Sequence, residues 1–323
     1  MTDIQPSQRV TVRVPAKINL ELAVGPRGDD GFHPLATVFH AVSLYDRITV
    51  TPAPDWSVTT VGSYADLVPD TQDNLAVRAA KLLASKAIEL GAESQPGPVA
   101  VVVDKHIPVA AGMAGGSADA AGVLLACADL WDLALLREDL EPLAAELGSD
   151  VPFLLHGGNA VGTGRGDEVS PVLSRGEVHW VLWLSTDEGL STPAVYAEFD
   201  RLHEGGEVPM PKLSADLMTA LRTMDPDAVG AALRNDLQGA SISLQPRLAE
   251  VIDAGLELGA RGALISGSGP TVAFVVASQA EALDLSMGLA ARGPKGDIVR
   301  VTGPVAGATV IDSRGPGPSL GLA

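Results

Sequence analysis

The chain has 323 residues, of which 46% are apolar and 19% are charged. This is the balance of a globular protein, and the length suits two domains better than one. The formal net charge of −18 argues against a protein that binds nucleic acid or an anionic membrane. Cys127 is the single cysteine, so the chain cannot form an internal disulfide and is not expected to build a cysteine-based zinc site.

The first nine residues are polar and lack the apolar core of a signal peptide. No uninterrupted apolar run approaches the length of roughly 18 residues that a membrane-spanning helix needs. We therefore expect a soluble, cytoplasmic protein.

In the first half of the chain, strand-like and helical periodicities follow one another. The expected strands are 10–14, 15–22, 37–42, 47–51 and 99–107, and the expected helices are 75–90, 118–130 and 139–147. Asn74 precedes the first of these helices and Gly91 follows it, which are typical start and stop signals. Residues 25–31 are expected to form a turn, and 55–70 a hairpin or loop.

Several polar residues of this half stand out. Lys17, Asn19 and Glu21 fall on one face of the strand over 15–22, because side chains alternate along a strand. For a lone lysine on a strand, a solvated sheet face is the commoner explanation. Phe32 and His33, directly after the turn, fit either a packed corner or a ring-stacking site, and the residues alone favour the corner.

Two later segments place polar side chains beside apolar or glycine-rich sequence. Asp150 stands next to Val151-Pro152-Phe153, where partial desolvation can tune a carboxylate for proton transfer. A helix or turn cap is the alternative. The glycine-rich segment 157–166, which includes Arg165, is either a ligand-side loop or a pair of hairpin turns.

A change of composition around 170–176 suggests a second unit. The elements expected beyond it are a strand over 178–184, a helix that opens at 191–193, helices over 214–223, 226–233 and 247–258, two strands joined by a glycine turn over 263–274, a helix over 280–291 and an edge strand within 300–311. The residues from 312 on are rich in Gly, Pro and Ser, and we expect them to be disordered. The predicted division is 1–170, 171–311 and a tail over 312–323.

The segment 108–121 consists almost entirely of small residues, between a strand and a helix. Small side chains let a ligand approach the backbone, and the free N–H groups and dipole of a helix start favour an anion such as phosphate. Composition alone leaves phosphate binding and a simple tight turn equally open. Gly-Lys-Ser and Gly-Lys-Thr do not occur in the chain, so this is not a Walker A loop. The spacing of Gly112-Met113-Ala114 also breaks the dinucleotide fingerprint G-x-G-x-x-G.

Five segments together resemble one family, the GHMP small-molecule kinases. They are P-A-K-I-N-L over 15–20, D-G-F-H-P-L over 30–35, the loop over 108–121, G-S-D-V-P-F over 148–153 and S-G-S-G-P over 266–270. The loop resembles the family's nucleotide loop, P-x-x-x-G-x-x-G-S-S-A. The segments over 30–35 and 148–153 resemble the members that phosphorylate a cytidine diphosphate-linked methylerythritol. The resemblance spans roughly 10–274, most of the chain.

The resemblance implies an α+β fold of two domains, with the active site in the cleft between them. It implies that Lys17 and Asp150 form the catalytic pair and that Lys105 lies near the nucleotide. The loop residues expected at the nucleotide are Pro108, Val109, Ala110, Ala111, Gly112, Met113, Ala114, Gly115, Gly116, Ser117 and Ala118.

The substrate side is implied in the same way. Phe32, His33 and Phe39 are expected to line a cytidine pocket. Asn19 is expected to face the substrate, and Tyr196 to place its ring near the base. Asp119, which stands where some family members carry Asn, is also expected on the substrate side.

The loop departs from the family pattern at several positions. Ala110, Ala111 and Ala114 stand where Gly is frequent, and Met113 replaces a common Leu. Because Ala tolerates positive φ poorly, we expect negative φ at these positions or a loop that differs in detail. The backbone N–H groups that would hold ATP are still present.

The implied reaction moves the γ-phosphoryl group of ATP to the tertiary 2-hydroxyl of the cytidine diphosphate-linked methylerythritol, a step of the non-mevalonate isoprenoid precursor pathway. Mg²⁺ is expected to bridge the phosphates, and Ser117 is the one residue considered as its ligand. The alternatives are another GHMP kinase, of the mevalonate, homoserine or sugar type, and a non-catalytic binding protein on the same fold. Phe32 and His33 argue against the former, and the presence of both Lys17 and Asp150 argues against the latter. A nucleotide dehydrogenase is a weaker alternative.

Overall fold

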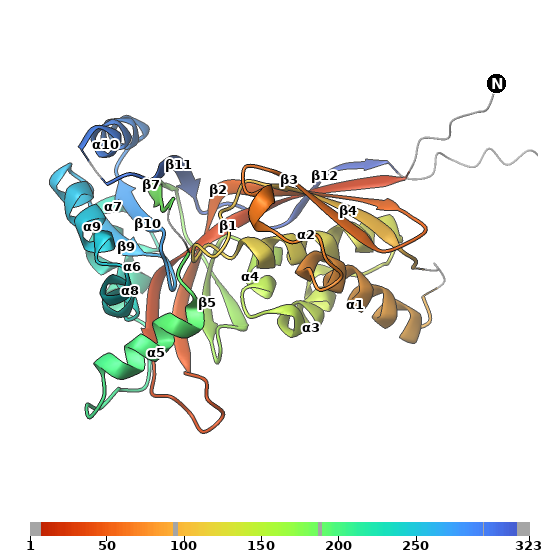
Figure 1. Ribbon diagram of the computed structural model, residues 1–323, viewed down its shortest axis with the longest axis horizontal. Coiled ribbons are helices and arrows are strands. Elements are labelled where there is room, and N and C mark those ends of the chain that lie inside the picture. Colours follow the sequence, from red (N-terminus) through yellow and green to blue (C-terminus); the bar gives the residue numbers. More distant parts are fainter. Residues whose placement is uncertain (1–7, 93–95, 187–188, 293, 315–323) are drawn as a thin grey trace, which may run out of the picture.

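The computed structural model describes residues 8–92, 96–186, 189–292 and 294–314. Its framework is a long antiparallel pair, β1 (Arg9–Val24) and β2 (Leu35–Pro52), which runs along the molecule (Figure 1). Six further strands extend this first sheet around the pair. Its main order is β12-β1-β2-β4-β3, while β5 pairs with β2, β6 pairs with β5, and β8 pairs with β1. Their bounds are β3 (Ser57–Gly62), β4 (Val99–Lys105), β5 (Asn159–Thr163), β6 (Glu168–Val172), β8 (Arg234–Asn235) and β12 (Thr309–Arg314).

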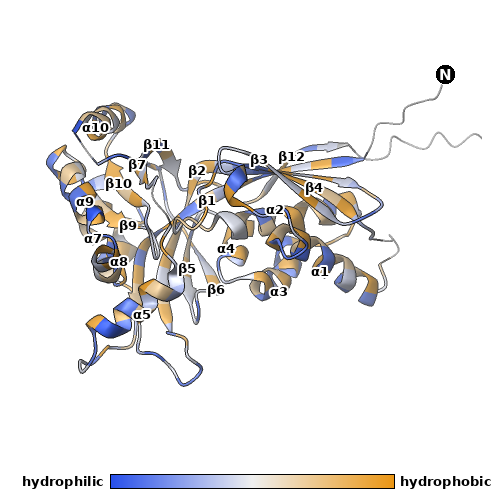
Figure 2. Cartoon of the chain, in the orientation of Figure 1, coloured by the Kyte–Doolittle hydropathy of each residue, from blue (hydrophilic) through white to orange (hydrophobic). Residues whose placement is uncertain are grey.

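Four helices, α1 to α4, pack on this sheet at one end of the molecule. They are α1 (Leu75–Glu89), α2 (Gly115–Leu130), α3 (Arg137–Leu147) and α4 (Val151–His156). The central helix α2 lies so close to the strands that a Cβ at Gly122 would approach Ile48 and Val14 to less than 3 Å. In Figure 2, α1 and α3 alternate between hydrophobic and hydrophilic residues, as helices do when one face lies on a sheet and the other outside.

The other end of the molecule holds a second, four-stranded antiparallel sheet, in the order β11-β7-β10-β9. Its strands are β7 (Val178–Leu184), β9 (Gly262–Ile265), β10 (Val272–Val276) and β11 (Asp297–Gly303), and the helices around it are α5 (Thr192–Leu202), α6 (Ala215–Ala220), α7 (Pro226–Ala232), α8 (Gln238–Leu244), α9 (Arg247–Glu257) and α10 (Gln279–Arg292). A separate core lies here, in which Trp183 and Phe274 pack against α9 and α10. Within the described residues, no helix is both long and apolar enough to cross a membrane.

Most predicted elements are present, but three groups differ. The strands predicted over 10–14 and 15–22 are one strand with an irregular register at Pro15, and those over 37–42 and 47–51 are likewise one strand. The edge strand predicted within 300–311 is two strands in different sheets, β11 and β12. The strands β3, β5, β6 and β8 and the helices α4 and α8 were not predicted.

The chain end also differs from its prediction. We expected disorder from residue 312, but Asp312 and Ser313 belong to β12 and pair with Thr11 and Val10. A sequence rich in Gly, Pro and Ser lacks the apolar alternation that signals a strand, yet pairing with β1 supplies its hydrogen bonds. The rest of the predicted tail, 315–323, lies outside the described residues. The division at residue 170 stays a prediction; the second sheet begins at Val178, and β12 returns to the first sheet.

Candidate active site

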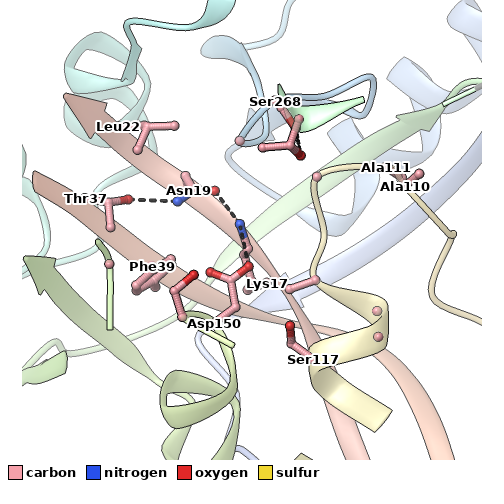
Figure 3. A pocket seen from close by; sticks show the side chains of 18 of the residues that line it. Lys17, Asn19, Leu22, Thr37, Phe39, Ala110, Ala111, Ser117, Asp150 and Ser268 are labelled. Carbon is pink, nitrogen blue, oxygen red and sulfur yellow. Dashed lines mark hydrogen bonds and ion pairs between the residues drawn. The ribbon is translucent and has the colours of Figure 1, made fainter. Parts of the chain in front are cut away.

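A cavity of about 380 Å³ lies where the two ends of the molecule meet, and Figure 3 shows its interior. It is lined by side chains from both long strands, by the small-residue loop, by the residues before α4, by α5 and by the turn between β9 and β10. Its lining includes Lys17, Asn19, Leu22, Thr37, Phe39, Pro108, Ala110, Ala111, Gly112, Ala114, Gly115, Gly116, Ser117, Ser149, Asp150, Arg165, Thr192, Tyr196 and Ser268.

Lys17 and Asp150 face each other in this cavity, with 3.8 Å between Lys17 Nζ and Asp150 Oδ2. Lys17 Nζ also donates a hydrogen bond of 2.6 Å to Asn19 Oδ1, and Asn19 Nδ2 donates one of 2.8 Å to Thr37 Oγ1. Burial lowers the pKa of the Lys17 ammonium, and the Asp150 carboxylate partly offsets that effect. The lysine is therefore fixed by its neighbours and aimed at the carboxylate, and the strand face that we regarded as solvated is a buried wall of the site.

Glu21 does not share that face, which corrects the prediction of three polar residues in a row. The register of β1 against β2 shifts between Asn19 and Glu21, so one extra residue enters β1 and the side chains beyond it turn over. Leu22 therefore lines the cavity. The buried Glu21 carboxylate instead accepts the backbone N–H of Ser214, at 3.0 and 3.1 Å.

Asp150 directly precedes α4, at the position where a cap would stand, but its side chain makes no capping hydrogen bond. The carboxylate is partly exposed, with 28% of the side chain accessible, and it lines the cavity. The capping alternative is therefore not supported by the geometry. A carboxylate within reach of an ammonium and open to a cavity can accept a proton from a bound hydroxyl.

The small-residue loop adopts left-handed backbone at Ala110, with φ of 52°, at Gly112, with 76°, and at Ala114, with 59°. The expectation of negative φ is wrong for Ala110 and Ala114 but not for Ala111, so the alternative of a loop that differs in detail stays open. Left-handed backbone costs an alanine roughly 1–2 kcal/mol, and contacts with distant segments hold the loop in this shape. Lys17 N–H donates to Met113 O, and Ser266 Oγ donates to Gly112 O at 2.9 Å. A Cβ at Gly112 would lie 2.0 Å from Ser266 O, so this position requires glycine.

Helix α2 begins at Gly115, earlier than the predicted start at 118, and no side chain caps it. The first N–H groups of a helix have no partner within the helix. Those of Gly115, Gly116 and Ser117 lie at the edge of the cavity, where they and the helix dipole could hold an anion.

Lys105 and Asp119 do not line the cavity, unlike their predicted roles at the nucleotide and the substrate. Lys105 is buried and donates hydrogen bonds of 2.6 Å to Asp46 Oδ2 and to Asp119 Oδ2. Asp46 Oδ1 accepts the backbone N–H groups of His106 and Ile107 at 2.6 and 2.8 Å. Burial raises the pKa of Asp119, against the effect of Lys105. These three side chains anchor the strand that leads into the loop. The sequence had pointed to two of them but not to Asp46.

Three further loop residues lie away from the cavity. Met113 and Ala118 are fully buried and do not line it. Val109 lines a different cavity, of about 530 Å³, together with Tyr64 and Leu67. The loop separates the two cavities, since Pro108, Ala110 and Ala111 line both.

An adjacent cavity of about 400 Å³ is lined by the rings of Phe32, His33 and Tyr196. His33 is at once a packed corner and part of this pocket, because Nδ1 lies 2.8 Å from Gly25 O and Nε2 lies 3.3 Å from Asp200 Oδ1. Both ring nitrogens already face oxygen acceptors, so a base in this pocket meets the ring face and not a free nitrogen.

Tyr196 and Phe39 differ in how well they match their predictions. Tyr196 lines both cavities, as its predicted place near the base requires. Burial raises its pKa to about 12, and Asp150 adds to that effect, so the hydroxyl stays protonated at neutral pH. Phe39 does not line the ring-lined pocket; it stacks on Phe153 with 5.0 Å between ring centroids and lies beside Lys17.

Four further residues line both cavities, namely Leu35, Ser149, Arg165 and Thr192. Of these, only Arg165 had been singled out in the sequence.

Comparisons with known proteins show the family to which the chain belongs. Residues 74–158 match the GHMP kinases N terminal domain and residues 217–295 match the GHMP kinases C terminal domain. The chain therefore belongs to the GHMP kinase family, and its mixed helix and sheet fold is the fold of that family.

Within the family, the chain is similar to proteins of one kind. It is 49% identical over 308 residues, 95% of each chain, to the 4-diphosphocytidyl-2-C-methyl-D-erythritol kinase of Mycobacterium bovis (strain BCG / Pasteur 1173P2). It is 49% identical over 317 residues to the protein of that name from Mycolicibacterium gilvum (strain PYR-GCK), covering 97% of this chain and 95% of the relative. A crystal structure of a 4-(cytidine 5'-diphospho)-2C-methyl-D-erythritol kinase superposes with a TM-score of 0.70 at 34% identity, over 90% of this chain and 98% of that one. A homoserine kinase from Cytophaga hutchinsonii, at 18% identity and a TM-score of 0.66 over 94% of this chain and 97% of that one, shares the fold.

Proposed function

We propose that this protein transfers the γ-phosphoryl group of ATP to the 2-hydroxyl of 4-diphosphocytidyl-2-C-methyl-D-erythritol, giving its 2-phosphate and ADP, in the non-mevalonate isoprenoid precursor pathway. One observation carries the proposal. The cavity that holds Lys17 and Asp150 opens on one side to a helix start suited to phosphate, and continues on another into a pocket lined by Phe32 and His33. The helix start suits a phosphoryl donor, the Lys17–Asp150 pair suits a hydroxyl, and the ring-lined pocket suits a flat base.

Asp150 is the general base of the proposed reaction. Its carboxylate accepts the proton of the substrate hydroxyl while that oxygen forms its bond to the γ-phosphorus and the bond to the β-phosphate oxygen breaks, leaving ADP. The Lys17 ammonium, 3.8 Å away, offsets the charge of the phosphoryl oxygens. Asn19 and Thr37 keep the lysine in place.

The loop and the start of α2 hold the phosphates of ATP through backbone N–H groups. Because the transition state of phosphoryl transfer is loose, catalysis depends on positioning and charge stabilisation, which a rigid loop provides. The cavity beyond the loop, lined by Val109, Tyr64 and Leu67, is our assignment for the nucleoside part of ATP. It lies on the side of the loop opposite Lys17 and Asp150, so the γ-phosphate of ATP reaches the catalytic pair.

The residues present fit a magnesium ion that is bound mainly through phosphate oxygens. Among the described residues, no three His, Cys, Asp or Glu side chains gather into a metal site. The cavity does hold two oxygen ligands of the kind Mg²⁺ prefers, the Ser117 hydroxyl and the Asp150 carboxylate. Bound Mg²⁺ supplies charge neutralisation for the β- and γ-phosphates.

A kinase for mevalonate, homoserine or a simple sugar is the closest alternative within the family. Such small alcohols need no second cavity, whereas here the ring-lined pocket of about 400 Å³ joins the catalytic one. A non-catalytic binding protein has no use for the Lys17–Asp150 pair. Both alternatives are less well supported than the cytidine-linked substrate.

A coupled assay of ADP release separates these functions. Purified protein, ATP and Mg²⁺ are incubated with 4-diphosphocytidyl-2-C-methyl-D-erythritol, with mevalonate or with homoserine. We expect turnover with the cytidine-linked alcohol alone. Turnover with another alcohol and none with this one would keep the kinase class and remove the assignment of Phe32 and His33. No turnover with any alcohol, in a protein that binds ATP, would favour the binding protein.

A further inference from the structure

Arg165 stands where the catalytic cavity and the ring-lined pocket meet. It lies in the turn between β5 and β6 and lines both cavities. Of the cationic residues that line either cavity, Lys17 lines only the catalytic one, and Arg27 and His33 line only the ring-lined one. We propose that Arg165 binds the diphosphate of the cytidine-linked substrate and that Asp30 holds its guanidinium in place until the substrate arrives. This inference rests on the function proposed above.

The shape of the substrate leads to this position. Its base and its reacting hydroxyl lie at opposite ends of the molecule, and a diphosphate joins them. With the base against Phe32 and Tyr196 and the hydroxyl at Asp150, the diphosphate has to cross the junction of the two cavities. The chain carries a net charge of −18, so an anionic linker depends on a local cation.

The other cations near this path are engaged elsewhere. Lys17 is buried between Asn19 and Asp150. Arg27 donates to Gly31 O at 3.2 Å and lies 3.8 Å from Asp200. Arg165 is therefore the cation best placed to meet the diphosphate, and a guanidinium suits phosphate oxygens because its N–H groups form a planar fork.

The contacts of Arg165 are of a kind that a ligand can replace. Its guanidinium carbon lies 3.8 Å from the centroid of the Phe32 ring, and its NH2 group lies 3.0 Å from Asp30 Oδ2. The side chains of Arg165 and Asp30 are 54% and 57% exposed, and an ion pair in such a setting is weak because solvent screens it. Three hydroxyl groups line the same junction, those of Ser149, Thr192 and Tyr196, and they can donate to the remaining phosphate oxygens.

The turn that carries Arg165 is itself well fixed. Leu35 N–H donates to Gly164 O at 2.8 Å, which ties the turn to β2. The backbone N–H of Arg165 donates to Asp167 Oδ1 at 3.1 Å. The glycines on either side have φ of 69° and 93°, values that L side chains rarely adopt. The backbone is thus positioned, and the long side chain is free to move from Asp30 to a ligand.

The test compares two ligands that differ only in the diphosphate. Cytidine and CDP are titrated into the full chain by isothermal calorimetry, for the wild type and for Arg165→Gln. We expect the wild type to bind CDP roughly 10- to 100-fold more tightly than cytidine, the range for charge-assisted hydrogen bonds. We expect Arg165→Gln to reduce the ratio of CDP affinity to cytidine affinity at least tenfold. The affinity for cytidine itself should change by less than about threefold.

Two variants sharpen the result. Arg27→Gln removes a cation that lines the ring-lined pocket alone, and it should affect cytidine and CDP equally. Asp30→Asn keeps an oxygen that can accept the Phe32 N–H but removes the charge that competes for Arg165. It should tighten CDP binding by up to about fivefold and leave cytidine binding unchanged.

Two outcomes would overturn the inference about Arg165. In the first, Arg165→Gln keeps the wild-type ratio of CDP affinity to cytidine affinity. In the second, Arg165→Gln weakens the binding of CDP and of cytidine equally, which would assign Arg165 to the base instead. A wild type that binds neither ligand would contradict the proposed function itself, and this inference with it.

Discussion

Lys17 and Asp150 meet 3.8 Å apart, although one lies in the middle of a long strand and the other precedes a short helix. The strand and the turn before α4 thus bring the lysine and the carboxylate to the same cavity. In the proposed reaction the two residues act together: the carboxylate takes the proton, and the lysine offsets the charge of the phosphoryl oxygens.

Asp150→Asn should reduce turnover by about 10²–10⁴-fold, the usual contribution of a general base. The amide has almost the same shape, so affinity for ATP should be nearly unchanged. The double variant with Lys17→Met should be about as slow as the slower single variant, because the two groups act as one unit. Steady-state kinetics of the three variants measure this, and normal turnover in Asp150→Asn would remove this residue from the role of base.

Gly112→Ala should disrupt the phosphate loop. The new Cβ would lie 2.0 Å from Ser266 O, and φ of 76° is itself unfavourable for alanine. We expect the KM for ATP to rise at least tenfold and the free energy of unfolding to fall by about 1–3 kcal/mol. Gly239→Ala is the matched control, because that glycine lies in α8 with open space around it. Equal behaviour of the two variants would mean that the loop does not depend on its docking to Ser266.

Lys105→Met should destabilise the fold by about 3–5 kcal/mol, because it leaves the buried carboxylates of Asp46 and Asp119 without their cation. Adding Asp119→Asn should recover part of this loss, since one of the two charges is then absent. Urea unfolding of both variants measures the difference. A variant of unchanged stability with a raised KM for ATP would return Lys105 to a direct role at the nucleotide.

His40 should make stability depend on pH. Its Nε2 accepts the Trp180 N–H at 3.0 Å and its Nδ1 lies 2.6 Å from Asn159 Oδ1, so the ring is neutral in the fold. Burial lowers its pKa to about 4, from an ordinary value of 6.5. The unfolded chain therefore takes up the proton first as the pH falls. The contribution of His40 is fully present above pH 6.5 and is lost towards pH 4, by up to about 3 kcal/mol.

The measurement is the free energy of unfolding in urea for the wild type and His40→Gln, at steps of ~0.5 pH unit between pH 4.5 and 7. The variant should show a shallower dependence across this range. His106→Gln, which changes an exposed ring, should keep the dependence of the wild type. Parallel curves for the wild type and His40→Gln would assign the pH dependence to other groups.

The chemistry of the site could be predicted from local sequence where short segments carry it. The small residues over 108–121 indicated a tight segment between a strand and a helix, equally open to a phosphate site and a simple turn. The apolar sequence after Asp150 indicated either a partly desolvated carboxylate or a cap. Both follow from residues that are close together in the chain. The structure places each of them at the same cavity.

The features that could not be predicted depend on residues far apart in the chain. The positive φ of Ala110 and Ala114 is unfavourable locally and is held by the docking of the loop to the turn between β9 and β10. The irregular register beyond Asn19, which places Leu22 in the cavity, is set by pairing with β2. The burial of Lys105 between two carboxylates requires Asp46, from another strand.

The most direct test of the account identifies the product by ³¹P NMR. Wild-type protein, ATP, Mg²⁺ and 4-diphosphocytidyl-2-C-methyl-D-erythritol are incubated, and the new phosphomonoester is recorded without proton decoupling. Because the carbon that bears the 2-hydroxyl carries no hydrogen, a 2-phosphate should give a signal without three-bond coupling to a proton, and Asp150→Asn should form it far more slowly. A phosphomonoester signal split by such coupling, or consumption of ATP to inorganic phosphate alone, would contradict the account.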